Sequence, residues 1–274
     1  MSSQAFSIIQ QMPSYYLVAG TLFVGFVAVN TKSLPLAYTV RLAPSICRLL
    51  KAKWSGPKNK ASQSASAHSP NSTPTNPPHA ARPTLFKYCT FQSTAVALDL
   101  DINIHKSNST FFSDADISRA ELITGLLSQS LADMGSPAFI LAGVQCKFQR
   151  EIRPYQRYDV SSRILAWTDK AMYVVTYFTK PGTKIGGDPD LLGGPQNLAT
   201  DVQLRRTLFA TLVSKYVFKA GRITVAPEHI FQEAGLLIEA DGKVGTVGID
   251  GLIGSEKVGA IVQVGLSYIA HCME

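Results

Sequence analysis

Acidic residues are missing from the first third of the chain. Residues 1–98 hold nine Lys or Arg and no Asp or Glu. The rest holds the other 17 cations and all 19 acids, a net charge of −2, although the whole chain of 274 residues carries +7. Because the positive charge belongs to the N-terminal third and not to the expected folded body, we do not expect a nucleic-acid partner.

Several motifs are absent as well. The four cysteines, Cys47, Cys89, Cys146 and Cys272, form no C-x-x-C pair, which argues against the usual zinc sites and a disulfide scaffold. They are typical of reduced thiols in a cytosol-facing protein. No G-x-S-x-G motif occurs, and the glycine-rich stretch 186–194 lacks a following Gly-Lys-Ser/Thr. The sequence therefore disfavours an α/β-hydrolase and a P-loop, and we predict neither a metal nor a cofactor.

Long apolar runs are scarce, and the one that stands out lies near the N-terminus. The stretch 15–29, YYLVAGTLFVGFVAV, is apolar apart from Thr21 and the tyrosine hydroxyls, and no charged residue precedes Lys32. A spanning helix needs roughly 20 apolar residues, so this run is short and would draw on Met12 and Pro13. All the nearby cations follow it, which by the positive-inside rule places the remainder of the chain in the cytosol.

We therefore predict a single-pass membrane protein in which residues 1–33 form the transmembrane anchor and the catalytic domain is cytosolic, with the endoplasmic reticulum as one candidate membrane. A cleaved signal peptide is the main rival, but the basic start and the A-x-A site are missing. A buried or interfacial apolar helix is the other alternative. Residues 34–54 mix leucines, cations and a tryptophan, as in a basic amphipathic juxtamembrane segment.

The remaining boundaries follow from composition. Residues 55–83 are rich in Ser, Pro and small polar residues, which cannot bury enough apolar area to offset the entropy of ordering. They predict a disordered linker. Residues 84–274 are then the folded domain.

Within this domain, one helix precedes a series of strands. After an expected strand at 84–98, Ile123, Leu127 and Leu131 lie in an apolar stripe at helical spacing that Gly135 ends. Period-two, β-branched stretches follow at 138–150, 158–168, 171–179 and 202–219. A short helix is expected at 226–235 and a final one at 254–273. This order predicts an α+β fold in which an antiparallel sheet wraps around one long helix.

The polar stretch before the long helix carries the candidate chemistry. It reads DLDINIHKSNSTFF over residues 99–112. Asp101, His105 and Asn108 resemble the D-x-x-x-H-x-N-N-x-x-Y signature of hotdog-fold acyl thioesterases of the 4-hydroxybenzoyl-CoA type. Ser107 stands where the first Asn of that signature is usual, and Phe111 stands where the Tyr is usual.

The resemblance is stronger to one branch of this superfamily, which contains membrane-associated thioesterases and thioesterases of fungal biosynthetic clusters. It rests on Asp99 and on the DADISR segment at 114–119. The resemblance implies a hotdog homodimer that hydrolyses an acyl-CoA or a carrier-bound acyl or polyketide thioester, in secondary-metabolite biosynthesis. The residues it assigns are catalytic Asp101, His105 and Asn108, and substrate-binding Ser107, Ser109, Phe111 and Phe112.

Thioester hydrolysis requires a base or nucleophile beside the carbonyl and hydrogen-bond donors for the developing oxyanion. Free N–H groups at a helix N-terminus can supply the donors. Asp101, just before the helix, can polarise a water or attack directly, and the sequence does not choose between these roles. Alternatively, Asp101, Asn103 and Asn108 merely cap the helix. Ser113 and Asp116 have the spacing of a capping box.

Two other functions fit the same pattern. A hotdog dehydratase or hydratase would add or remove water on an acyl thioester, and hydration of an enoyl thioester would reveal it. A non-catalytic, membrane-tethered acyl-binding protein would bind the ligand without turnover.

Overall fold

The computed structural model describes residues 14–55, 85–183, 185, 206–240, 243–248, 251–253 and 255–273. The predicted linker, apart from Ser55, and most of the glycine-rich insertion at 180–201 lie outside the described residues. One antiparallel sheet dominates the rest, in the order β1-β3-β4-β5-β2, with β6 paired to β5. Its strands are β1 (Cys89–Thr94), β2 (Ala138–Phe148), β3 (Arg157–Trp167), β4 (Met172–Thr179), β5 (Leu208–Ala220) and β6 (Ile223–Val225).

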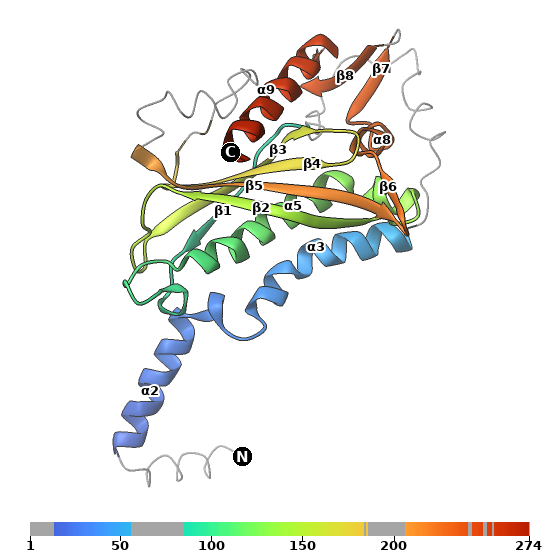
Figure 1. Ribbon diagram of the computed structural model, residues 1–274. Helices are drawn as coiled ribbons and strands as arrows, with labels where there is room; N and C mark the ends of the chain where they lie inside the picture. Colours follow the sequence, from blue (N-terminus) through green and yellow to red (C-terminus); the bar gives the residue numbers. More distant parts are fainter. Residues whose placement is uncertain are drawn as a thin grey trace, which may run out of the picture.

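The long helix α5 (Asn108–Asp133) lies along one face of this sheet (Figure 1). Its apolar stripe packs into the main core, where Ile123, Leu127 and Leu131 are at most 2% exposed. The helix ends at Asp133, and Gly135 follows two residues later with a φ of +81°, a left-handed conformation that favours glycine. The predicted sheet around one long helix is confirmed.

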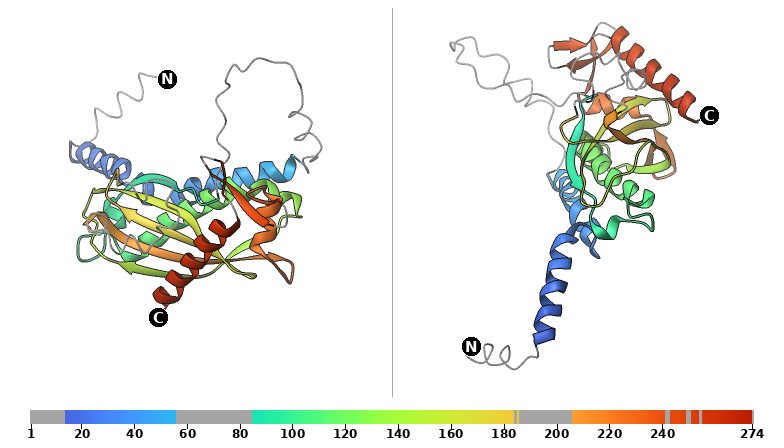
Figure 2. Two further views of the ribbon diagram at one scale, coloured as in Figure 1. Left: turned by 90° about the horizontal axis from the view of Figure 1, so that it is seen from above. Right: turned by 90° about the vertical axis from the view of Figure 1, so that its left-hand side faces the viewer.

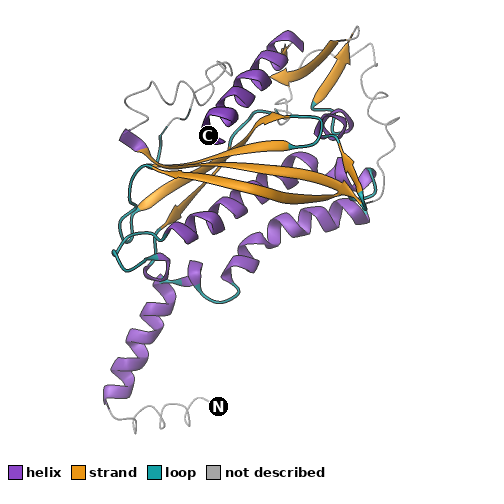
Figure 3. Ribbon diagram, viewed as in Figure 1, coloured by secondary structure: helices purple, strands orange, loops and turns teal. Residues whose placement is uncertain are grey.

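The three central strands are buried on both faces, because helices cover both sides of the sheet (Figure 3). Side chains alternate along each strand with a period of two. Ile164 and Val174 face the core beneath α5, whereas Leu165 and Val175 belong to a second cluster on the opposite face. That second cluster contains Ile269 of the C-terminal helix.

The C-terminal helix α9 (Ser255–Met273) crosses the face of the sheet opposite α5 (Figure 2). It approaches β3 closely at Gly265, where a Cβ atom would lie 2.7 Å from the Leu165 carbonyl oxygen and 2.8 Å from the Ala166 Cβ. The short helix α8 (Pro227–Glu233) and a small sheet of β7 (Leu237–Ala240), β8 (Lys243–Gly248) and β9 (Gly251–Ile253) complete this part.

Residues 14–55 of the N-terminal region form α2 (Ser14–Val29), the 3₁₀ turn η1 (Thr31–Ser33) and α3 (Ala37–Trp54). Helix α2 projects away from the sheet, whereas α3 packs along the outer side of α5. Among the described residues, no helix is both long enough and apolar enough to cross a membrane.

This finding corrects the predicted transmembrane anchor and the single-pass membrane location. Helix α2 covers 16 residues, whereas a spanning helix needs about 20. The apolar run that suggested an anchor does form this helix, but Asn30 ends it and the chain turns at η1. Residues 34–54, predicted as a juxtamembrane segment, are mostly helix α3 against α5.

Candidate active site

The candidate residues lie on a short loop between the 3₁₀ turn η2 (Ala97–Asp99) and the start of α5. The loop folds back on itself, because Leu100 and Lys106 form an antiparallel bridge and the Asp101 N–H donates to the His105 carbonyl at 2.9 Å. Ile104, at the turn, has a φ of +59°. This conformation is rare for a β-branched residue and marks a strained tip.

Asp101 and His105 face one another at this tip. The His105 Nδ1 lies 3.5 Å from the Asp101 Oδ1, and the two side chains are 29% and 27% exposed. The Asn103 N–H donates to the same Oδ1 at 2.8 Å. The structure thus brings the predicted carboxylate and imidazole together in a partly exposed position that solvent can reach.

The predicted polar residues of the helix start lie next to this pair. Helix α5 begins at Asn108, which is exposed, with Ser107 as its N-cap residue. In this described segment, the Ser107 side chain makes no cap hydrogen bond, and its Oγ lies 3.0 Å from the Ser109 Oγ instead. The first N–H groups of α5 therefore have no side-chain cap from Ser107, and they give this end of the helix its usual partial positive charge.

Because α5 begins at Asn108, Ser113 and Asp116 stand inside the helix and form no capping box. Asp116 instead pairs with Arg119, one turn further along α5.

The two predicted aromatic residues lie deeper. Phe111 is 2% exposed and packs against Phe148 and Phe178, with ring centroids 5.2 and 4.8 Å away. Phe112 is partly buried beside the same cluster. These two side chains pack in or against the core at the start of α5, where the loop ends.

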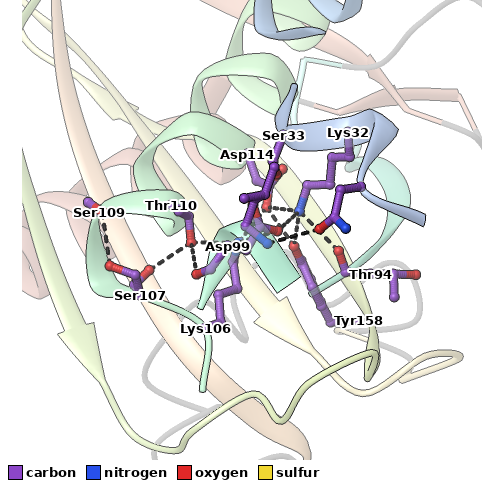
Figure 4. Close-up of polar contacts among 12 residues, drawn as sticks. Lys32, Ser33, Thr94, Asp99, Lys106, Ser107, Ser109, Thr110, Asp114 and Tyr158 are labelled. Atoms are coloured by element: carbon purple, nitrogen blue, oxygen red, sulfur yellow. Dashed lines mark hydrogen bonds and ion pairs between the residues drawn. The ribbon is translucent and has the colours of Figure 1, made fainter. Parts of the chain in front are cut away.

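A buried ionic cluster, which sequence reasoning missed, lies directly beneath the loop (Figure 4). The carboxylates of Asp99 and Asp114 are 4% and 1% exposed, and the ammonium of Lys106 is fully buried. The Lys106 Nζ lies 2.9 Å from the Asp114 Oδ2 and 3.6 Å from the Asp99 Oδ2. The hydroxyl of Tyr158 donates to the Asp114 Oδ2 at 2.6 Å.

Asp99 and Asp114, which carry part of the family resemblance in the sequence, are both interior residues. A signal for Asp114 was present in the sequence. It stands three residues after Phe111 and one before Ala115, so helical periodicity places it on the buried face.

The cluster shifts the pKa values of its members. Burial alone would raise the pKa of Asp114, but Lys106, the other cations and the Tyr158 hydrogen bond hold it well below its usual value. Burial lowers the pKa of Lys106, against the opposing effect of Asp114. Burial and the Asp114 charge raise the pKa of Tyr158, which stays a neutral donor. The cluster is therefore built around an ionised Asp114.

An open cavity of about 720 Å³ is lined by Arg150, Glu151, residues 153–156, Lys180 and Phe209, and none of these belongs to the loop. The connection to the loop is through Ile152, a buried residue outside the lining, whose carbonyl accepts a hydrogen bond from the Lys106 N–H at 2.8 Å. The charged lining side chains are Arg150, Arg153, Lys180 and Glu151. This wall suits an anionic ligand. In the part of the chain that the structure describes, no three His, Cys, Asp or Glu side chains are grouped closely enough to hold a metal ion.

Comparison with known proteins agrees with this architecture. Residues 96–218 match the family model described as the Thioesterase-like superfamily. The chain is 38% identical over 183 residues to the probable thioesterase atnL of Emericella nidulans, and 39% identical over 178 residues to the thioesterase poxG of Penicillium oxalicum. These alignments cover 60% and 59% of this chain, and 58% of each relative.

Among solved structures, the probable thioesterase YbaW of Escherichia coli is similar, with 12% identity and a TM-score of 0.41. The similarity covers 53% of this chain and 95% of that one. Residues 96–218 are thus similar to the Thioesterase-like superfamily, and the chain spans somewhat more than half the length of the two curated relatives.

Proposed function

We propose that this protein is a thioesterase that hydrolyses an acyl group from coenzyme A or a carrier protein, in the biosynthesis of a secondary metabolite. The observation that carries the proposal is the partly exposed pair of Asp101 and His105 before the uncapped start of α5, within a segment that matches the Thioesterase-like superfamily. Each curated relative above is named a thioesterase.

In this proposal, Asp101 acts on the reacting centre and α5 stabilises the charge. The Asn103 N–H and His105 both lie against Oδ1 of Asp101, so we assign the chemistry to Oδ2. The N–H groups of residues at the start of α5, with the Asn108 amide, would hold the oxyanion. The cations of the cavity wall would pair with the phosphates of coenzyme A or phosphopantetheine.

The test is hydrolysis of a panel of acyl-CoA thioesters by the full chain and its Asp101→Asn variant. We expect kcat to fall by about 10²- to 10⁴-fold, the usual contribution of a positioned base. Asp133→Asn is the matched control, because Asp133 is exposed at the far end of α5. Equal rates for Asp101→Asn and wild type would remove Asp101 from the mechanism, and hydration of an enoyl-CoA without hydrolysis would favour a hydratase.

A single turnover in H₂¹⁸O distinguishes the two roles of Asp101. If it acts as a general base, the water oxygen enters the product acid directly in the first turnover. If it acts as a nucleophile, an acyl anhydride forms, and water attack at the Asp101 carboxyl carbon gives an unlabelled first product and a labelled Asp101. A labelled Asp101 with an unlabelled first product therefore identifies the nucleophile, whereas a labelled product is given both by the general base and by water attack at the acyl carbon of an anhydride.

We also propose a homodimer that forms through strand β2. In the described sheet, β2 is an edge strand that pairs only with β5, and Ile140 and Leu141 on it are 46% and 42% exposed. An exposed apolar edge favours pairing with another strand. Sedimentation should show a dimer for wild type and a monomer for Ile140→Lys, while Ile223→Lys on β6 leaves the dimer intact. A monomeric wild type would contradict the proposal.

A further inference from the structure

The segment that precedes the predicted linker is anchored in the ionic cluster beneath the candidate loop. Asn30 is 1% exposed, and its side-chain oxygen accepts a hydrogen bond from the Leu98 N–H at 2.9 Å. Ser33 donates to the Asp99 Oδ1. These contacts place η1 against the residues that lead into the loop, more than 60 positions later in the chain.

Lys32 makes the central contacts. Its side chain is 15% exposed, and its ammonium group reaches four oxygen atoms with three N–H donors. The distances from Nζ are 2.7 Å to Asp99 Oδ2, 2.7 Å to the Tyr158 hydroxyl, 3.0 Å to Asp114 Oδ2 and 3.1 Å to the Thr94 carbonyl. Figure 4 shows Lys32 entering between these groups from a different part of the chain.

The charge balance of the cluster depends on this segment. Asp99 and Asp114 are two buried carboxylates, and residues 85–183 supply only Lys106 within ion-pair distance of them. Lys32 supplies the second cation. Arg41 of α3 adds a third, at 2.9 Å from the Asp114 Oδ1. Without Lys32, Lys106 at 3.6 Å is the one cation that the described residues leave near Asp99, beside the hydrogen bond from Ser33, and a buried charge without a close counter-charge is costly.

The same contacts join the two ends of the loop. Asp99 stands at its beginning and Lys106 near its end, and the Ser107 N–H donates to the Asp99 carbonyl at 2.8 Å. Lys32 and Lys106 both contact the Asp114 Oδ2. Because Lys32 links Asp99 to Asp114, it holds the start of the loop on the helix that carries its end.

We infer that Lys32 is a positioning residue for the thioester-cleaving loop, acting through Asp99 and Asp114, so that the N-terminal segment 30–41 is a working part of the active site. The inference rests on the proposed function for its consequence in catalysis. Its structural half stands separately: Lys32 sets the geometry of residues 99–107. A displacement of about 1 Å in a reacting group can cost 10²-fold in rate.

The experiment compares Lys32→Met, Lys32→Arg and Arg48→Met in the full chain. Arg48 is the matched control, since it joins α3 to Glu121 of α5 at 3.1 Å on the exposed surface. Hydrogen–deuterium exchange of a peptide that covers residues 99–108 should accelerate about 10-fold or more in Lys32→Met and remain unchanged in Arg48→Met. We expect kcat to fall about 10- to 100-fold with a smaller change in KM. Lys32→Arg should recover most of the rate.

A double variant separates positioning from stability. Lys32→Met with Asp99→Asn removes one charge of each sign, which should restore the unfolding temperature but leave kcat low. Unchanged exchange in Lys32→Met would overturn the inference, and so would recovery of kcat together with stability in the double variant. If wild type hydrolyses no thioester, the proposed function fails, whereas the exchange measurement still decides whether Lys32 holds the loop.

Discussion

The loop before α5 holds two groups of similar composition in opposite surroundings. At the tip, Asp101 and His105 lie 3.5 Å apart and are more than a quarter exposed. In the ionic cluster beneath the loop, Asp99 and Asp114 contact Lys32 and Lys106 and are at most 4% exposed. The comparison teaches that burial decides the role of a charge. The closely paired charges of the buried ionic cluster hold the conformation of the loop, whereas the Asp101 carboxylate at the tip remains accessible to solvent.

The largest expected effect on the free energy of unfolding comes from disrupting the ionic cluster with Asp114→Asn. This change removes one of the two carboxylates that Lys32 and Lys106 share and leaves Asp99 as their remaining counter-charge, and the loss of one member of a buried ion pair costs about 3–5 kcal/mol. Urea denaturation of the full chain measures the free energy of unfolding. A loss below about 1 kcal/mol, comparable to a surface substitution, would contradict the importance of the cluster.

Acid provides the control for that variant. The cations of the cluster depress the pKa of folded Asp114, whereas an unfolded Asp has a pKa of about 3.9. The contribution of Asp114 is therefore fully present above that value and is lost as the pH falls towards the folded-state pKa. The gap in stability between wild type and Asp114→Asn should narrow below about pH 4. A constant gap between pH 7 and pH 2 would assign the loss to packing alone.

A smaller loss of stability is expected from Gly265→Ala. This change lies far from the loop, so it tests whether lower stability alone loosens residues 99–108. The new methyl group would overlap the Leu165 carbonyl oxygen, and overpacking costs about 1–3 kcal/mol. Gly259→Ala is the control, because its Cβ would meet no atom within 4 Å. We expect a lower melting temperature for Gly265→Ala only, with wild-type hydrogen exchange in residues 99–108. Faster exchange there would mean that any loss of stability loosens the loop.

Local patterns predicted most of the fold because its elements are strongly periodic. The apolar stripe through Ile123 and Leu127 became the buried face of α5, and the four strand-like stretches became β2 to β5. The pattern overestimated the opening strand, which covers only Cys89–Thr94. The small sheet β7–β9 went unpredicted, because its strands are short and glycine-rich.

The site was predicted in part. The motif spacing brought Asp101 and His105 together correctly, although their catalytic roles stay predictions. Local spacing could not reveal the ionic cluster, because Lys32 lies 67 residues before Asp99 and 126 before Tyr158. The same sequence separation explains why the N-terminal residues were wrongly predicted to form a membrane anchor. A lysine after an apolar run indicates a membrane boundary only if it does not form an ion pair with a buried carboxylate elsewhere in the chain.

The junction at Asn30 has a mechanical consequence. Helix α2 projects from the domain with side chains such as Leu22 and Phe23 more than 60% exposed. Its last turn is tied to Asn30 by the hydrogen bond from the Asn30 side chain to the Phe26 carbonyl at 2.8 Å. Two residues later comes Lys32. Because Asn30 and Lys32 are both held by the domain, we expect a change in the tilt of α2 to alter the contacts of Lys32 with Asp99 and Asp114.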